Sequence, residues 1–293
     1  MLRVLATLLL AVFFAACTEI PITEAEAFQN KRTVTPATFD VPGFTLSQHR
    51  VPLADEALPD SLDADSLALD AWFMRHTGFN GEPARGTVLY FGGQGFLMVT
   101  FADFIEAMAQ HRVNLFMVDY RGYGMSDGEP SVAGLKADGL AVYDYVQALD
   151  GVEPDRLVLH GHSMGTFMAT YVAQEAALPP RGLLLESPVT TVEELTSALV
   201  PALLKPLVSF DIDDALQRED NPGRVAGLAM PTLVIVGSED NITPPKLAED
   251  VHEASVGQPK RLVEVEGGGH NGLEAYDAFH SALAEFYDMA LGN

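Results

Sequence analysis

The sequence predicts an α/β protein whose central sheet is mostly parallel and flanked by helices. Short apolar runs, typical of buried parallel strands, alternate with helix-like segments from about Gly86 to the C-terminus. Hydrophobic residues make up 48% of the 293 residues, which is enough for a sizeable core. No internal repeat or low-complexity tract interrupts the alternation. We therefore expect one large domain over residues 39–293.

The first residues differ from the rest of the chain. An apolar run of 13 residues, 4–16, follows Arg3 and is itself followed by Cys17. As a helix this run would rise only about 20 Å, which is too short to cross about 30 Å of hydrocarbon. A positive residue before the run and small residues at its end are typical of a signal peptide, which we predict over residues 1–16.

Cys17 is the only cysteine, so an intramolecular disulfide is excluded. Residues 14–17, Phe-Ala-Ala-Cys, resemble a bacterial lipobox, in which the cysteine becomes the acylated first residue of the mature protein. The resemblance implies lipidation of Cys17 and an extracytoplasmic lipoprotein anchored to a membrane of the bacterial cell envelope. An ordinary signal peptide that is cut elsewhere is the alternative. Residues 17–38 lack clear periodicity and predict a lipid-anchored tether.

The charge balance narrows the choice of partners. The formal net charge is −24, from 17 Lys and Arg against 41 Asp and Glu. Such a chain repels phosphate backbones, so we expect no nucleic-acid partner. The expected partners are a small-molecule or acyl substrate and, through the N-terminal lipid, a membrane. The sequence leaves the oligomeric state open.

Ser163 is the predicted nucleophile. It lies in Gly161-His162-Ser163-Met164-Gly165, which follows the strand-like run 157–159 and leads directly into a helix-like segment. A Gly-x-Ser-x-Gly sequence between strand and helix is typical of a nucleophile elbow, a strained turn that exposes the serine hydroxyl.

A serine of this type needs an acid and then a histidine further along the chain. Asp240 is the predicted acid because it follows the buried strand 231–237, and catalytic groups gather beyond the carboxyl ends of such strands. The adjacent Glu239, and Glu186 after another predicted strand, are the alternatives.

His270 is the predicted general base. It follows the last predicted strand and three glycines, and it comes after both Ser163 and Asp240. His160 and His162 flank the elbow and are expected to shape the pocket. The remaining histidines lack such a setting: His49, His76, His111, His252 and His280.

Two backbone N–H groups are expected to bind the developing oxyanion. The residue after the nucleophile, Met164, supplies the first. The second is expected from Gln94, because the strand that ends at Phe91 turns through Gly92-Gly93-Gln94-Gly95, where small residues let a substrate approach the backbone. A phosphate-binding loop is disfavoured, since no Gly-Lys-Ser/Thr follows.

Together these motifs resemble the α/β-hydrolase superfamily, and most closely its branch of serine aminopeptidase-like and monoglyceride-lipase-like hydrolases. The resemblance runs from about Gly86 to the C-terminus and implies an α/β-hydrolase fold. It also implies that the segment 119–126 braces the sheet beside the site. The motifs that carry it are residues 92–95, 119–126, 161–165, 237–240 and 268–270.

Residues 188–229 are expected to form a short insertion, either a small lid or a plain crossover. The stretch 195–207 is apolar and helix-like, although Pro201 and Pro206 interrupt it.

These expectations combine into a serine hydrolase that cleaves an ester, thioester or amide through an acyl-enzyme. No metal or organic cofactor is expected, since the chain has neither a His-Glu-x-x-His sequence nor a nucleotide-binding fingerprint. An acyltransferase on the same fold is one alternative, and a non-catalytic binding protein is another.

Overall fold

The computed structural model describes residues 18–28, 31–32, 41–52, 67–78 and 83–292. The predicted signal peptide and Cys17 lie outside the described residues and stay predictions. None of the described helices is both long enough and apolar enough to span a bilayer.

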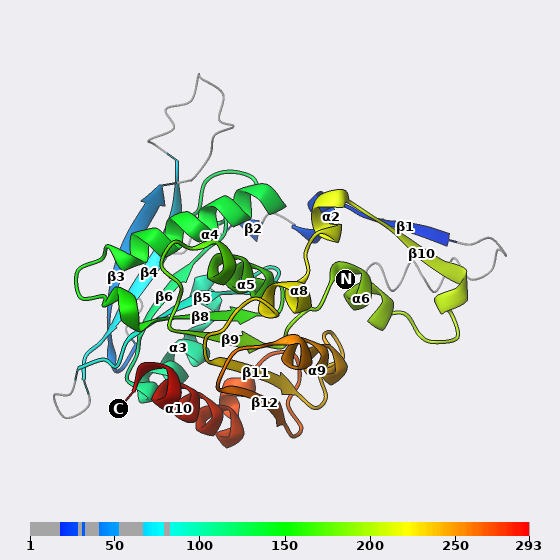
Figure 1. The fold of residues 1–293 in the computed structure, drawn as a ribbon. Coiled ribbons are helices and arrows are strands. Elements are labelled where there is room, and N and C mark those ends of the chain that lie inside the picture. The colour runs from blue at the N-terminus through cyan, green and yellow to red at the C-terminus, as the bar shows by residue number, and fades with distance from the viewer. Residues whose placement is uncertain (1–17, 29–30, 33–40, 53–66, 79–82, 293) are drawn as a thin grey trace.

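An eight-stranded sheet forms the centre of the molecule (Figure 1). Neighbouring strands pair in parallel except at β4, which runs antiparallel to both β3 and β6. The predicted mostly parallel sheet is therefore confirmed. In sheet order the strands are β12 (Lys260–Val265), β11 (Thr232–Gly237), β9 (Gly182–Glu186), β8 (Leu157–His162), β5 (Thr87–Phe91), β6 (Asn114–Val118), β4 (Ala68–His76) and β3 (Phe44–Pro52).

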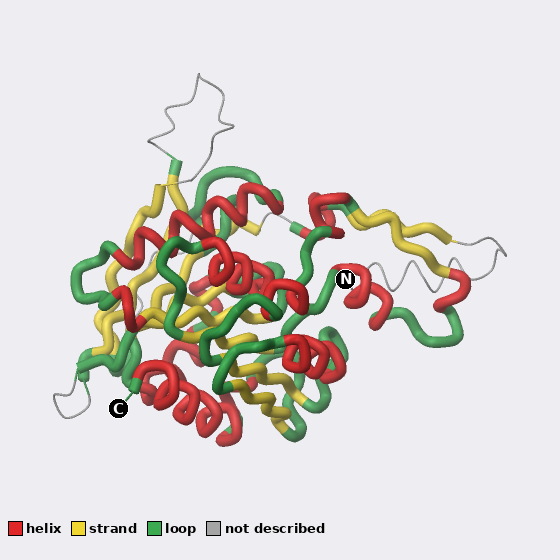
Figure 2. Tube along the Cα trace, viewed as in Figure 1, coloured by secondary structure: helices red, strands yellow, loops and turns green. Residues whose placement is uncertain are grey.

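Helices cover both faces of the sheet (Figures 1 and 2). One face packs against α4 (Val132–Gln147), α5 (Gly165–Glu175) and α9 (Pro245–Ala254), and the other against α3 (Ala102–Met108) and α10 (Asp277–Leu291). Strand β5 serves both cores, because Leu89 and Phe91 face the first set of helices and Val88 and Tyr90 the second. Short 3-10 helices complete this part of the chain: η2 (Met98–Thr100), η3 (Ala109–His111), η4 (Pro154–Arg156) and η6 (Leu273–Ala275).

The N-terminal segment is part of the fold, which corrects the predicted tether over 17–38. Strand β1 (Thr18–Ile22) pairs in parallel with β10 (Val208–Ile212), and β2 (Lys31–Arg32) with β7 (Tyr123–Gly124). Between them lie α2 (Glu24–Ala27) and the buried Phe28. The partner strands are far away in sequence, so local periodicity could not reveal the pairing. The other residues of the predicted tether lie outside the described part of the chain.

Residues 192–212 and β1 form an arm that projects from the body (Figure 1), whereas both ends of the predicted insertion 188–229 lie in the body, where Val189 and Val225 are buried. The predicted helix over 195–207 is wrong beyond Ala198, because the helix ends there and Val208–Ile212 is a strand. Proline lacks the N–H that a helix needs and disfavours helical geometry in the residue before it, and Pro201 and Pro206 both lie in this stretch. The arm contains α6 (Val192–Ala198), η5 (Lys205–Leu207) and β10. The chain then returns to the body through α7 (Asp214–Gln217), which contacts α4, and α8 (Asn221–Val225), which contacts α5 and α9.

Candidate active site

Ser163 stands on a strained turn between β8 and α5. Its φ is +53°, a left-handed value that side-chain-bearing residues rarely adopt. The turn is possible because glycine flanks it: a Cβ at Gly165 would lie 2.0 Å from the carbonyl oxygen of Phe91, and one at Gly161 would lie 2.6 Å from the carbonyl oxygen of Gly165. The structure thus has the local geometry that the Gly-x-Ser-x-Gly sequence predicts.

His270 lies directly against this serine. Its Nε2 is 3.0 Å from Ser163 Oγ, and its Nδ1 is 2.8 Å from Asp240 Oδ2. The loop after β12 carries the imidazole there, and His162 secures the loop because its Nε2 lies 3.0 Å from the carbonyl oxygen of His270. Burial lowers the pKa of His162, so its ring is neutral and its Nε2–H donates this bond.

Asp240 is enclosed by hydrogen-bond donors at the end of β11. Its Oδ1 accepts from the N–H groups of Ile242 and Thr243, and its Oδ2 accepts from the Thr243 hydroxyl at 2.8 Å as well as from His270. Burial by itself would raise the pKa of Asp240. The hydrogen bond and charge of His270 and the bonds from Thr243 outweigh burial and hold that pKa below its usual value. The group is therefore a carboxylate at neutral pH.

The two alternative acids lie elsewhere. Glu239 is exposed, and Glu186 lies 2.8 Å from Nε2 of the buried His160. Burial would raise the pKa of Glu186, but the hydrogen bond from His160 and the nearby histidine rings outweigh this and lower it. The backbone of Glu186 also supports the elbow, since its carbonyl oxygen accepts from the N–H of Ser163 at 2.9 Å.

The loop that contains Gln94 passes beside the serine. Gly93 approaches it so closely that an added Cβ would lie 3.1 Å from Ser163 Cβ. Gln94 follows, and its side-chain amide turns away to the carbonyl oxygen of Ala27 at 2.5 Å. Across the described residues, no hydrogen bond uses the backbone N–H of Gln94 or of Met164. Both groups are free to donate to a ligand.

Sequence reasoning missed the role of Thr243 and left that of His162 unspecific. Thr243 Oγ1 lies 2.8 Å from Asp240 Oδ2 and 3.0 Å from the carbonyl oxygen of Ser187, so its one O–H proton is shared between the acid and the end of β9. A threonine three residues after an aspartate is a turn pattern in which side chains bond nearby backbone, and this signal could have identified it. No comparable signal exists for His162, because its partner lies 108 residues away.

Comparison with known proteins identifies the family. The family described as serine aminopeptidase S33 matches residues 82–211, and the TAP-like protein family matches residues 212–288. The uncharacterized protein Rv2307c of Mycobacterium tuberculosis is 34% identical over 232 residues, which cover 78% of each chain. This chain belongs to the α/β-hydrolase superfamily. The Arabidopsis thaliana α/β-hydrolase domain-containing protein WAV2 is 26% identical over 75% of this chain and 73% of its own.

Solved structures confirm the predicted α/β-hydrolase fold. The Pyrococcus furiosus esterase Pf2001 superposes with a TM-score of 0.65 at 16% identity, and the match covers 90% of this chain and 98% of the esterase. The Pyrococcus horikoshii acylaminoacyl peptidase superposes with a TM-score of 0.60 at 16% identity over 86% of this chain and 42% of its own. In the described part of this α/β-hydrolase, no three His, Cys, Asp or Glu side chains are grouped to hold a metal ion.

The segment 119–126 links the sheet to α4 beside the site. Arg121 forms a buried ion pair with Asp138 at 2.7 Å, and the Ser126 hydroxyl donates to the carbonyl oxygen of Asp119 at 2.6 Å. Asp119 Oδ1 accepts from the N–H of Met98 at 2.9 Å. Burial raises the pKa of Asp119 to about 7; the bond from Met98 opposes this rise and the charge of Asp70 adds to it.

Asp119→Asn is expected to remove a pH dependence of stability. Between its ordinary value of 3.8 and about 7 the folded protein keeps a proton on Asp119 that the unfolded chain releases, so stability falls as pH rises through this window. Asparagine can still accept from Met98 but does not titrate. The variant should therefore gain stability relative to the parent between pH 5 and pH 8, by an amount of the order of a few kcal/mol. Thermal melting at each pH measures the difference, and a difference that does not change with pH contradicts the assignment.

Proposed function

We propose that this α/β-hydrolase is a serine hydrolase that cleaves an ester, thioester or amide through an acyl-enzyme. The observation that carries the proposal is the continuous hydrogen-bond network from Ser163 through His270 to the buried Asp240. In such a network the imidazole can accept the proton of the serine hydroxyl, and the carboxylate stabilises the positive charge that results on the imidazole.

Each group has a definite step in the proposed reaction. Asp240 accepts from Nδ1–H of His270, which leaves Nε2 unprotonated and able to take the proton of Ser163. The serine Oγ forms a bond to the acyl carbon, and the N–H groups of Gln94 and Met164 donate to the oxygen that becomes negative. His270 then gives its proton to the leaving group as that bond breaks. A water molecule, deprotonated by His270, releases the acyl group and restores the serine.

Carboxylic esters are the first substrates to test. The solved structures that share this fold include esterases, such as Pf2001 and an acetyl xylan esterase from Thermoanaerobacterium, as well as peptidases. A series of p-nitrophenyl esters of increasing acyl length would report the chain that the site prefers. The corresponding anilides would report whether amides are cleaved.

A fluorophosphonate probe tests the mechanism. We expect the folded protein to gain one covalent adduct and peptide mapping to place it on Ser163, because only an activated serine attacks the probe at a useful rate. Ser163→Ala should remain unlabelled, and a second serine, Ser197→Ala in α6, serves as the matched control that should still label. Equal labelling of Ser163→Ala and the parent would overturn the proposal.

A further inference from the structure

The arm carries exposed apolar side chains at its outer end. We define the arm tip as residues 201–207, between α6 and β10. Leu203 is 87% exposed and Leu207 is 50% exposed, whereas most leucines in the described chain are buried. Two large apolar side chains that are exposed within one short segment indicate a surface that binds another apolar surface.

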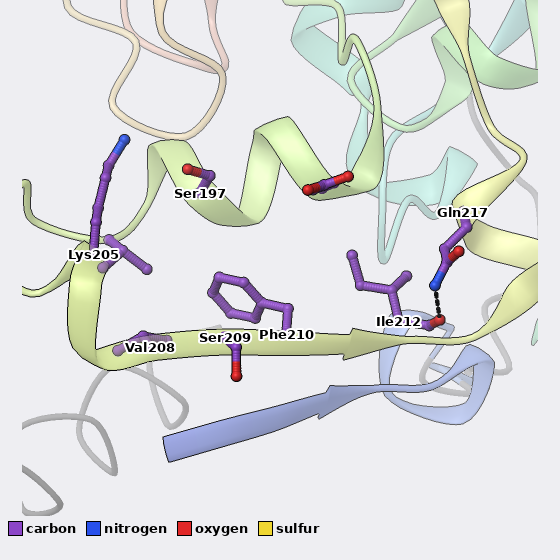
Figure 3. A pocket seen from close by; sticks show the side chains of 9 residues that line it. Ser197, Lys205, Val208, Ser209, Phe210, Ile212 and Gln217 are labelled. Atoms are coloured by element: carbon purple, nitrogen blue, oxygen red, sulfur yellow. Dashed lines mark hydrogen bonds between the residues drawn. The ribbon is translucent and has the colours of Figure 1, made fainter. Parts of the chain in front are cut away.

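The inner side of the arm is already covered by its own helix. Val208, Phe210 and Ile212 point from β10 toward α6 and line a hollow of about 380 Å³ between the two elements, whereas Ser209 points away (Figure 3). The pairing of Ile20 with Phe210 and of Ile22 with Ile212 extends this inner face onto β1. Lys205 of the arm tip also borders this hollow, but Leu203 and Leu207 do not line it.

The charge of the tip differs from that of the whole chain. Residues 195–210 contain no Asp or Glu, although the chain has 41 of them, and they include the exposed Lys205. The tip is therefore an apolar surface with a single positive charge, on a protein whose net charge is −24, and the nearest acid on the paired strand is Glu19 beside Ser209. This combination suits a surface with anionic headgroups above hydrocarbon.

The N-terminal end of the described chain lies beside the tip. Thr18 pairs with Val208, the residue after Leu207. Consecutive Cα atoms are about 3.8 Å apart, and paired strands about 5 Å apart. The described chain therefore begins within roughly 10 Å of Leu207, so the lipid that the sequence predicts on Cys17 would bring the bilayer to the tip.

We propose that the arm tip docks on a lipid bilayer, with Leu203 and Leu207 at the boundary of the acyl chains and Lys205 among anionic headgroups. A lipid on Cys17 would be the first contact with the membrane and the arm tip the second. Two contacts hold a protein on a membrane in one orientation, which a single one does not. This orientation points the arm toward the bilayer, and α2, which follows β1 in the chain, contacts the site because the carbonyl oxygen of Ala27 accepts from the side-chain amide of Gln94. The inference is independent of the proposed hydrolase mechanism.

Depth-dependent fluorescence quenching tests the docking on the full chain. Single variants Leu203→Cys, Leu207→Cys and Leu178→Cys are labelled with an environment-sensitive maleimide, and the parent chain supplies the background from Cys17. Leu178 is the matched control, since it is 44% exposed but lies before β9, at the opposite edge of the sheet from Ser163. The proteins are bound to vesicles of phosphatidylethanolamine and phosphatidylglycerol that carry nitroxides on their acyl chains.

We expect a blue shift and a severalfold loss of emission for labels at 203 and 207, and neither for the label at 178. An unquenched tip, or equal quenching at all three positions, overturns the proposal. Light scattering without vesicles tests the alternative, in which a second copy of the chain binds the arm tip. If Leu203→Ser/Leu207→Ser converts a dimer into a monomer, a second copy of the chain covers the tip and the membrane proposal fails.

Discussion

Ser163→Ala is expected to lower kcat for an ester substrate by about four orders of magnitude or more, with little effect on stability. The variant lacks the oxygen that attacks the acyl carbon in the proposed mechanism. It keeps the turn, since the flanking glycines and the bond from the N–H of residue 163 to the carbonyl oxygen of Glu186 are unchanged. Turnover of a p-nitrophenyl ester and thermal melting measure the two effects.

His270→Ala should reduce kcat to a similar extent, because the serine proton then has no acceptor within hydrogen-bond distance in the described site. The double variant should be hardly slower than either single one, since the groups act as a unit. His252→Ala in α9 is the matched control and should leave the rate unchanged. Near-normal turnover by His270→Ala would show that the base lies elsewhere.

Asp240→Asn has the second large expected effect, a loss of about 10³ to 10⁴ in kcat at a nearly constant KM. The asparagine amide can turn an N–H toward Nδ1 of His270. The ring would then carry its proton on Nε2, where the serine needs an acceptor. Steady-state kinetics separate kcat from KM, and thermal melting reports the loss of the charged acceptor for Thr243.

Glu186→Gln is the matched comparison, since it removes another buried carboxylate close to the same serine. Its hydrogen bond with His160 stabilises the fold and glutamine can still accept that bond, so we expect a stability loss of about 1–2 kcal/mol and a much smaller change in kcat. If Asp240→Asn were mild and Glu186→Gln abolished turnover in a folded protein, the role of the acid would pass to Glu186.

The sequence alone predicted those parts of the site that depend on local structure. The elbow at Ser163 could be predicted because its two glycines permit one strained turn between strand and helix. The chain order of serine, acid and histidine is the one that the resemblance to α/β-hydrolases implies, and the carboxyl ends of parallel strands meet at one edge of the sheet, where these groups can gather. The same reasoning favoured Asp240 but left Glu186 as an alternative, because both stand at the ends of buried strands.

Only the tertiary structure decided the features that depend on contacts between distant segments. It placed His270 against Asp240 and His160 against Glu186, and it paired β1 with β10, 190 positions later in the chain (Thr18 with Val208). Such pairings leave no periodic trace in either segment. A short strand or a single imidazole meets its partner only when the whole sheet has formed. The free energy of such a contact depends on both segments, so neither segment's sequence predicts it alone.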